Sequence, residues 1–215
     1  MTVNGDNEIN FKGSKRMTNF KPLYFDFMST THIDPHVLQQ MLKYMGPDGH
    51  FGNANSQHAF GRVAAQAIES ARQQIADTLH TDPESIIFTS GATEANNLAL
   101  FGTARQYQRQ GRHIITMRTE HKSVLDSCYQ LEREGFKVTY LTPDQDGILA
   151  LDVLDNAIEK DTLLASIMHV NNETGVIQDI AEIGQILREN YPNTSRSRPM
   201  DVSKVVAGAT IRQAN

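Results

Sequence analysis

The chain has 215 residues, 39% of them hydrophobic, and carries a formal net charge of −5 at pH 7. This length is enough to bury a substantial core, and the weakly acidic balance offers no basic patch to nucleic acid. No segment reaches the roughly 18 consecutive apolar residues that a membrane-spanning helix needs. We therefore expect neither nucleic acid nor a membrane as a partner.

Cys128 is the single cysteine of the chain. One cysteine excludes an internal disulfide and fits a reducing compartment. Residues 1–21 are polar and mixed in charge, without the apolar core of a signal peptide. We therefore expect a cytoplasmic protein, and Met17 is a candidate second start site because regular patterning begins only near Leu23.

The first half of the chain alternates apolar runs with helical periodicity. Pro35 suits the first turn of a helix and Asp34 suits its cap. The predicted elements are a strand at 23–27, a helix at 35–44, a glycine-rich loop at 46–55, a helix at 59–79, a strand at 85–89 and a helix at 92–110.

The second half continues the alternation, with strands that are near-continuous apolar runs. We predict strands at 113–117, 136–141 and 163–169, and helices at 123–134, 151–159 and 180–189. Apolar strands separated by helices are typical of a buried parallel sheet. The sequence therefore predicts an α/β fold in three layers, with a mostly parallel sheet and helices on both faces.

The periodic pattern stops after Pro192. Asn193–Pro199 is polar and basic, and the last fifteen residues form no clear element. In an α/β fold the helix at 180–189 should lead into another core strand, and none follows. We expect three regions: a polar extension at 1–22, a folded part at 23–192 and a divergent tail at 193–215.

Four clusters of polar residues lie in loops or at predicted strand ends, where open α/β sheets bind ligands. Ser90–Asn97 opens a helix whose free amides and threonine hydroxyl suit a phosphate group. By itself it fits a well-capped helix equally well, and it contains neither a dinucleotide fingerprint nor a Walker loop. Gly49–Gly61, taken alone, fits a flexible loop.

The other two clusters follow the strands at 113–117 and 163–169. His121, within Thr119–Ser123, could stack on a flat ligand or carry a proton near neutral pH. Asn171 and Asn172 form a polar elbow that could donate to a ligand oxygen. Alone, each fits a helix terminus or a turn better. We assign no metal ligands, since His113 and His169 lack the spacing of a metal site.

Together, the clusters closely resemble the cysteine desulfurases that supply iron–sulfur cluster assembly. These enzymes belong to the class V aminotransferases, of fold type I among those that use pyridoxal 5'-phosphate (PLP). The resemblance covers residues 23–190, and it makes 23–192 the N-terminal part of that domain. It rests on Ser90–Asn97, Thr119–Leu125 and His169–Gly175, and also on Asp26–Pro35 and Leu131–Phe136.

The resemblance implies roles for four residues. Ala92 and Thr93 hold the cofactor phosphate, which agrees with the argument from the helix start. His121 stacks on the pyridine ring and is the candidate catalytic residue for proton transfer. Asn172 hydrogen-bonds the phenolic oxygen of the ring. The reaction is then removal of sulfur from L-cysteine, giving L-alanine and a persulfide on an enzyme cysteine.

The resemblance also implies partners. The implied partners are L-cysteine, an iron–sulfur scaffold, sulfur-acceptor proteins and, for a full-length relative, a second copy.

The sequence departs from the family pattern near its end. The family's cofactor-linking lysine and catalytic cysteine have no counterpart here, and Asp201 and Lys204 lack the family's context. Cys128 falls on a helix and is interpreted as a packed residue.

These departures predict a truncated and inactive chain. Two alternatives remain open: a non-catalytic remnant or dimerising fragment, and another class V enzyme such as a selenocysteine lyase.

Overall fold

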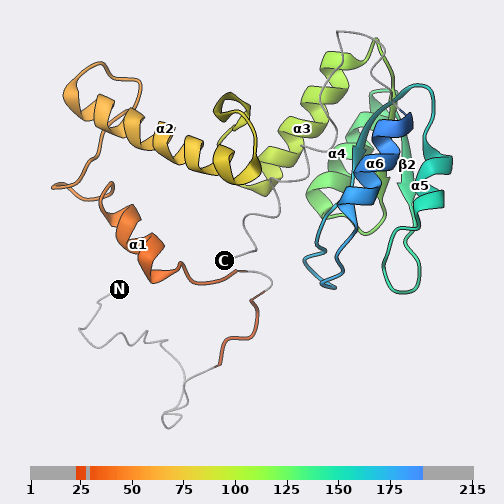
Figure 1. Ribbon diagram of the computed structural model, residues 1–215, viewed down its shortest axis with the longest axis horizontal. Helices are drawn as coiled ribbons and strands as arrows, with labels where there is room; N and C mark the ends of the chain where they lie inside the picture. Colours follow the sequence, from red (N-terminus) through yellow and green to blue (C-terminus); the bar gives the residue numbers. More distant parts are fainter. Residues whose placement is uncertain (1–22, 28–29, 191–215) are drawn as a thin grey trace, which may run out of the picture. The chain divides into compact units, whose positions relative to one another are not determined.

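The computed structural model describes residues 23–27 and 30–190, and the chain divides into two units, Met1–His32 and Ile33–Asn215 (Figure 1). In the first unit, the Tyr24 hydroxyl donates to the carbonyls of Asp26 and Thr30, over 2.7 and 3.1 Å. The strand predicted at 23–27 is wrong. Within the described ranges this exposed segment has no partner strand, and a strand forms only where another backbone completes the ladder.

Three parallel strands form the sheet of the second unit, in the order β2-β1-β3. They are β1 (His113–Met117), β2 (Lys137–Leu141) and β3 (Thr162–Ser166). Every residue of the central strand β1 is buried. Burial on both faces explains why β1 reads as a continuous apolar run in the sequence.

Helices cover both faces of this sheet (Figure 1). On one side lie α3 (Ala92–Tyr107) and α4 (Lys122–Arg133), and on the other lie α5 (Leu151–Ala157) and α6 (Ile180–Asn190). Neighbouring strand residues point to opposite faces, so the two cores share the same strands. The α3/α4 core contains Leu100, Ala104, Ile114, Val124, Cys128, Leu131, Phe136 and Leu164, and the α5/α6 core contains Ile115, Met117, Leu141, Leu149, Leu154, Ala165, Ile167, Ile183 and Leu187.

The three-layer parallel α/β architecture expected from the sequence is therefore confirmed. Several predicted boundaries shift by one to three residues. The largest shifts are that the helix predicted at 92–110 ends at Tyr107 and the strand predicted at 163–169 ends at Ser166. None of the helices described has the length and apolar content that crossing a membrane requires.

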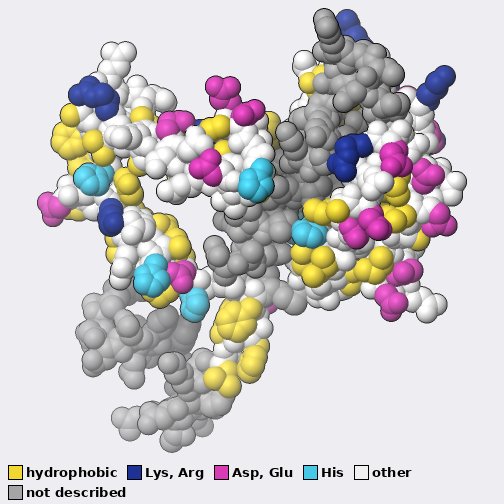
Figure 2. Space-filling model, in the orientation of Figure 1, with side chains coloured by type: hydrophobic (Ala, Val, Ile, Leu, Met, Phe, Trp, Pro, Cys, Tyr) yellow, Lys and Arg dark blue, Asp and Glu magenta, His cyan; other side chains and the backbone are white. Residues whose placement is uncertain are grey.

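Two further helices, α1 (Pro35–Leu42) and α2 (Ala59–Leu79), come before α3 in the chain. As predicted, Asp34 caps α1 and accepts a hydrogen bond from the amide of His36 over 2.8 Å. No residue of α1 is buried. Figure 2 shows hydrophobic side chains on the surface of this part of the chain. The exposed apolar residues of the two helices are Val37, Leu38, Met41, Leu42, Phe60, Val63, Ile68 and Leu79.

The strand predicted at 85–89 is also wrong. A short 3₁₀ helix, η1 (Pro83–Ser85), is followed by an extended segment that pairs with no strand among the residues described. Ile87 and Phe88 are exposed there. The apolar content of this segment is typical of a strand, but no neighbouring strand supplies the hydrogen bonds.

Candidate functional site

The first part of the site is the start of α3. Gly91 is the N-cap residue, and no side chain caps the helix. Glu94 turns back, and its Oε2 accepts hydrogen bonds from the amide and the hydroxyl of Ser90, over 2.6 and 2.7 Å. These bonds lower the pKa of Glu94, the hydroxyl bond having the larger effect.

The amides of Ala92 and Thr93 remain without an acceptor among the described residues. Thr93 is exposed, so its hydroxyl is accessible beside these two amides. Free N–H groups at a helix N-terminus, together with the helix dipole, favour an anion. The start of α3 therefore offers the free donors that the predicted phosphate-binding role requires.

The second part of the site follows β1. His121 is the N-cap residue of α4, and its Nδ1 accepts a hydrogen bond from the Ser123 amide over 3.1 Å. The side chain is exposed, so the ring face and Nε2 are accessible. The predicted stacking residue thus lies at the carboxyl end of the central strand, held by its own helix.

The third part follows β3, where Asn171 and Asn172 have different surroundings. The Asn171 Oδ1 accepts from the amides of Glu173 and Thr174, both over 2.9 Å, and its Nδ2 donates to the carbonyl of Thr119 over 2.9 Å. The Asn172 side chain has no hydrogen-bond partner within the described residues. Asn171 therefore shapes the turn, and the amide of Asn172 is available to a ligand.

Hydrogen bonds join these three parts to one another. Asn96, one turn into α3, donates from Nδ2 to the Ser123 Oγ over 2.9 Å, and that oxygen lies 2.9 Å from the His121 Nδ1. The bond from Asn171 to Thr119 ties the turn after β3 to the loop after β1. Because β1 and β3 are parallel, both loops lie at the same edge of the sheet.

Glu120 is a further connection that the sequence reasoning missed. Its carboxylate is 7% exposed and accepts a hydrogen bond from the Met168 amide. Burial raises the pKa of Glu120 to about 7, and the Met168 bond opposes this rise only in part. Glu120 thus holds the segment that follows β3 against the loop that carries His121.

A search of the sequence for polar pairs could have found Asn96 and Ser123. Asn96 and Asn97 are adjacent on α3, and Ser123 and Ser127 are one turn apart on α4. The Ser127 hydroxyl donates to the Asn97 Oδ1 over 2.6 Å, a second bond between α3 and α4 in which the serine is the donor. Glu120 gave no such signal, because a glutamate beside a histidine is ordinary on a surface loop.

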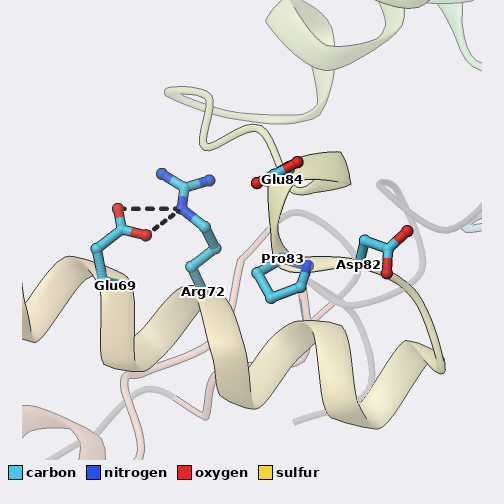
Figure 3. Close-up of a pocket in the computed structure, with 5 residues that line it drawn as sticks. All are labelled: Glu69, Arg72, Asp82, Pro83 and Glu84. Atoms are coloured by element: carbon cyan, nitrogen blue, oxygen red, sulfur yellow. Dashed lines mark hydrogen bonds and ion pairs between the residues drawn. The ribbon is translucent and has the colours of Figure 1, made fainter.

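A hollow between α2 and η1 contains none of the predicted site residues (Figure 3). Arg72 is bonded there to Glu69 over 3.2 Å and donates to the carbonyl of Ile86. Its guanidinium carbon also lies 5.0 Å from the centre of the Phe88 ring. Arg72 therefore fixes the segment that leads into α3, and the hollow is a structural feature beside the site.

The start of α3, His121 and Asn172 lie in three successive segments of the chain. The family model described as "Aminotransferase class-V" matches residues 23–194. The chain belongs to the class V aminotransferase family.

Relatives of this class V aminotransferase chain are named "Cysteine desulfurase IscS". The protein of Colwellia psychrerythraea is 55% identical over 168 residues, which is 78% of this chain and 42% of the relative. That of Escherichia coli K12 is 56% identical over 168 residues, with the same coverage. The chain thus spans well under half the length of these curated relatives.

Solved structures agree with the family assignment. "SspA in complex with cysteine" has a TM-score of 0.73 and 41% identity, covering 78% of this chain and 48% of that one. A "NIFS-like protein" has a TM-score of 0.72 and 38% identity, covering 75% and 44%. DndA from Streptomyces lividans has a TM-score of 0.67 and 46% identity, covering 77% and 46%.

Cys128 is the single cysteine of this class V chain and lies apart from the predicted ligand-binding groups. It is fully buried in the α3/α4 core. Burial, with smaller contributions from Glu120 and Glu132, raises the pKa of its thiol to about 12. The interpretation of Cys128 as a packed residue is confirmed. Asp201 and Lys204 lie outside the described residues.

Proposed function

We propose that this chain supplies one wall of the PLP site of a cysteine desulfurase, the phosphate-binding and ring-binding wall. The class V aminotransferases use PLP, and the relatives named above are cysteine desulfurases. The observation that carries the proposal is the hydrogen-bonded connection among the start of α3, His121 and the turn of Asn172. The reaction is removal of sulfur from L-cysteine to give L-alanine and a persulfide.

The residues at the start of α3 fit the phosphate of PLP. The amides of Ala92 and Thr93 have no acceptor in the described part of the chain, and the Thr93 hydroxyl is exposed beside them. Each can donate to a phosphate oxygen, and the helix dipole adds to the attraction. In this proposal they bind and orient the cofactor without taking part in bond making.

His121 and Asn172 fit the ring of the cofactor. His121 has an exposed ring whose orientation is fixed by Ser123, so its face can stack on a flat ligand. The Asn172 amide lacks a partner among the described groups and can donate to a ring oxygen. When bound, PLP supplies the electron sink for the reaction. We assign His121 the proton-transfer role and the other three residues binding.

Several wider assignments belong to the same proposal. The substrate is L-cysteine, and the sulfur passes to an iron–sulfur scaffold or another acceptor protein. A full-length relative is expected to form a homodimer, in the cytoplasm. Residues 23–192 form the N-terminal part of the PLP-dependent transferase domain, between a polar extension at 1–22 and a divergent tail at 193–215.

We propose that the 215-residue chain does not itself complete the reaction. A persulfide must form on an accessible thiolate, and the fully buried Cys128 with its raised pKa does not provide one. The purified chain with PLP and L-cysteine should therefore release neither alanine nor sulfide. Turnover that is lost in His121→Ala would contradict this expectation.

The binding part of the proposal is tested by titrating the purified chain with PLP and following the visible absorbance of the cofactor. Thr93→Val removes one hydroxyl donor to a charged group, a loss of about 1.5–3 kcal/mol. The affinity for PLP should therefore fall about tenfold or more. Inorganic phosphate should compete with PLP for the unmodified chain.

Thr78→Val is the matched control, because Thr78 is also an exposed helical threonine, on α2. This variant should keep the affinity of the unmodified chain. Equal affinities for Thr93→Val and Thr78→Val would overturn the placement of the phosphate at α3.

A further inference from the structure

The hydrogen bonds around His121 determine which ring nitrogen carries the proton. The His121 Nδ1 lies 3.1 Å from the backbone nitrogen of Ser123 in the N-cap geometry of α4. A backbone N–H can only donate, so Nδ1 must accept and carries no proton. The neutral ring therefore has its hydrogen on Nε2, the nitrogen away from the helix.

A second donor strengthens this arrangement. The Ser123 hydroxyl oxygen lies 2.9 Å from the His121 Nδ1 and 2.9 Å from the Asn96 Nδ2. The Asn96 amide nitrogen can only donate, so it occupies a lone pair of the hydroxyl oxygen. The hydroxyl hydrogen is then directed toward Nδ1, where the hydroxyl and the Ser123 amide share one lone pair.

Burial protects this connection from competing water. Ser123 is 8% exposed, and Asn96 is partly buried between α3 and α4. The His121 ring, in contrast, is exposed. Nδ1 of the ring is thus held by groups of the protein, and Nε2 has no hydrogen-bond partner among the described residues.

We propose that Ser123 and Asn96 are positioning residues that hold His121 in the Nε2-protonated tautomer, so that its ring meets the ligand as a hydrogen-bond donor. The tautomer is set by groups of this chain and does not require a bound ligand. Only the identity of the ligand rests on the proposed function. The neutral ring can pass its Nε2 proton to a ligand only when Nδ1 takes up a proton in its place, which displaces the bond from Ser123.

The test is a long-range proton–nitrogen NMR spectrum of the full chain, labelled with ¹⁵N in histidine and recorded at pH 8 without PLP. The signals of His121 are identified by their loss in His121→Gln. We expect a protonated Nε2 and an unprotonated, hydrogen-bonded Nδ1. A His121 ring protonated at Nδ1 would overturn the proposal directly, without any variant of Ser123.

Variants then distinguish the effect of the Ser123 hydroxyl on the Nδ1 resonance from a general effect of the packing of α4. Ser123→Ala should move the Nδ1 resonance toward that of a less hydrogen-bonded nitrogen, and Ser123→Thr should restore it. Asn96→Ala should move it in the same direction by a smaller amount. Ser127→Ala is the matched control, because the Ser127 hydroxyl donates to the Asn97 Oδ1 and to the backbone carbonyl of Ser123 but makes no hydrogen bond with His121 or with the Ser123 hydroxyl.

An unchanged Nδ1 resonance in both Ser123→Ala and Asn96→Ala would overturn the role of these two residues. If Ser123→Ala does not fold, Asn96→Ala and the tautomer of the unmodified chain still test the proposal. The PLP affinity of Ser123→Ala should fall about threefold or more, with Ser127→Ala unchanged. Failure of the unmodified chain to bind PLP would reject the proposed function, while the tautomer would still be decided by the spectrum.

Discussion

The buried carboxyl group of Glu120 makes the stability of the fold depend on pH. Its pKa is raised from 4.5 to about 7, chiefly by burial. Between these two pH values the folded chain holds a proton that the unfolded chain has released. The free energy of unfolding therefore falls as pH rises from about 4.5 to 7, and this contribution is constant outside that window.

Glu120→Gln removes this contribution, because the amide does not titrate. The difference in free energy of unfolding between Glu120→Gln and the unmodified chain should rise by about 2–3 kcal/mol from pH 4.5 to pH 8. Urea denaturation at several pH values measures it. The change of this free-energy difference with pH is the quantity that tests the prediction, since the buried amide lowers the free energy of unfolding by the same amount at each pH.

Glu84→Gln serves as the control, because this side chain in η1 is exposed. The difference for Glu120→Gln should change more with pH than the difference for Glu84→Gln. Equal pH dependence of the two differences would show that Glu120 is not buried in the folded chain.

Whether the role of a single residue could be predicted from the sequence depended on how far along the chain its partner lies. Asp34 and Asn171 were readable from the sequence because a cap and an Asx turn involve residues two or three positions away. The Asn96–Ser123 bond joins residues 27 positions apart, and Glu120 reaches Met168 across 48 positions. Such pairings depend on which helices and strands become neighbours, so a local pattern can suggest polar residues but cannot give their partners.

At the scale of elements, the helices were more predictable than the strands. The helix at 59–79 was predicted with its observed bounds, since periodicity and capping act within a few residues. The strand at 113–117 was also correct, because β1 finds partners on both sides. The segments at 23–27 and 85–89 have the composition of strands but no partner among the described residues. A strand forms only beside a partner strand, and the composition of a segment does not show whether that partner exists.

The segment before α3 is fixed by a side chain instead of by a sheet. Arg72 of α2 donates to the carbonyl of Ile86, and its guanidinium group lies over the Phe88 ring. This segment leads directly to the turn at Ser90–Thr93. Arg72 therefore helps to fix the position of the start of α3 relative to α2.

Arg72→Met should loosen this connection, because methionine keeps the apolar stem and removes every donor. We expect the free energy of unfolding to fall by about 1–2 kcal/mol. Hydrogen exchange at the amides of residues 86–90 should become faster in native buffer. Arg109→Met is the matched control, since Arg109 is exposed and has no described hydrogen bond or ion pair. Equal exchange in the two variants would show that Arg72 does not hold the segment.

At the scale of the whole molecule, the buried core belongs to the sheet and its four flanking helices. The two core clusters draw on α3, α4, α5, α6 and the three strands. α1 contributes no buried residue, and α2 buries Gly61, Ala64 and Ala76 alone. The sequence showed the amphipathic pattern of α2 but could not show whether its apolar face is covered. Large exposed apolar surfaces favour association, so we expect the purified chain to have low solubility.

This uneven burial predicts uneven protection in hydrogen exchange measured by mass spectrometry. Helices shorter than about 12 residues are marginal in water without tertiary packing, and α1 has 8 residues, none of them buried. Peptides from α1 should therefore exchange roughly 100-fold faster than those from β1, whose residues are all buried. α6 is the internal control, because it is also short, with 11 residues, but buries Ile183, Gly184 and Leu187. Its amides should exchange slowly, as those of β1 do. Protection of α1 equal to that of α6 would mean that the apolar face of α1 is covered in solution.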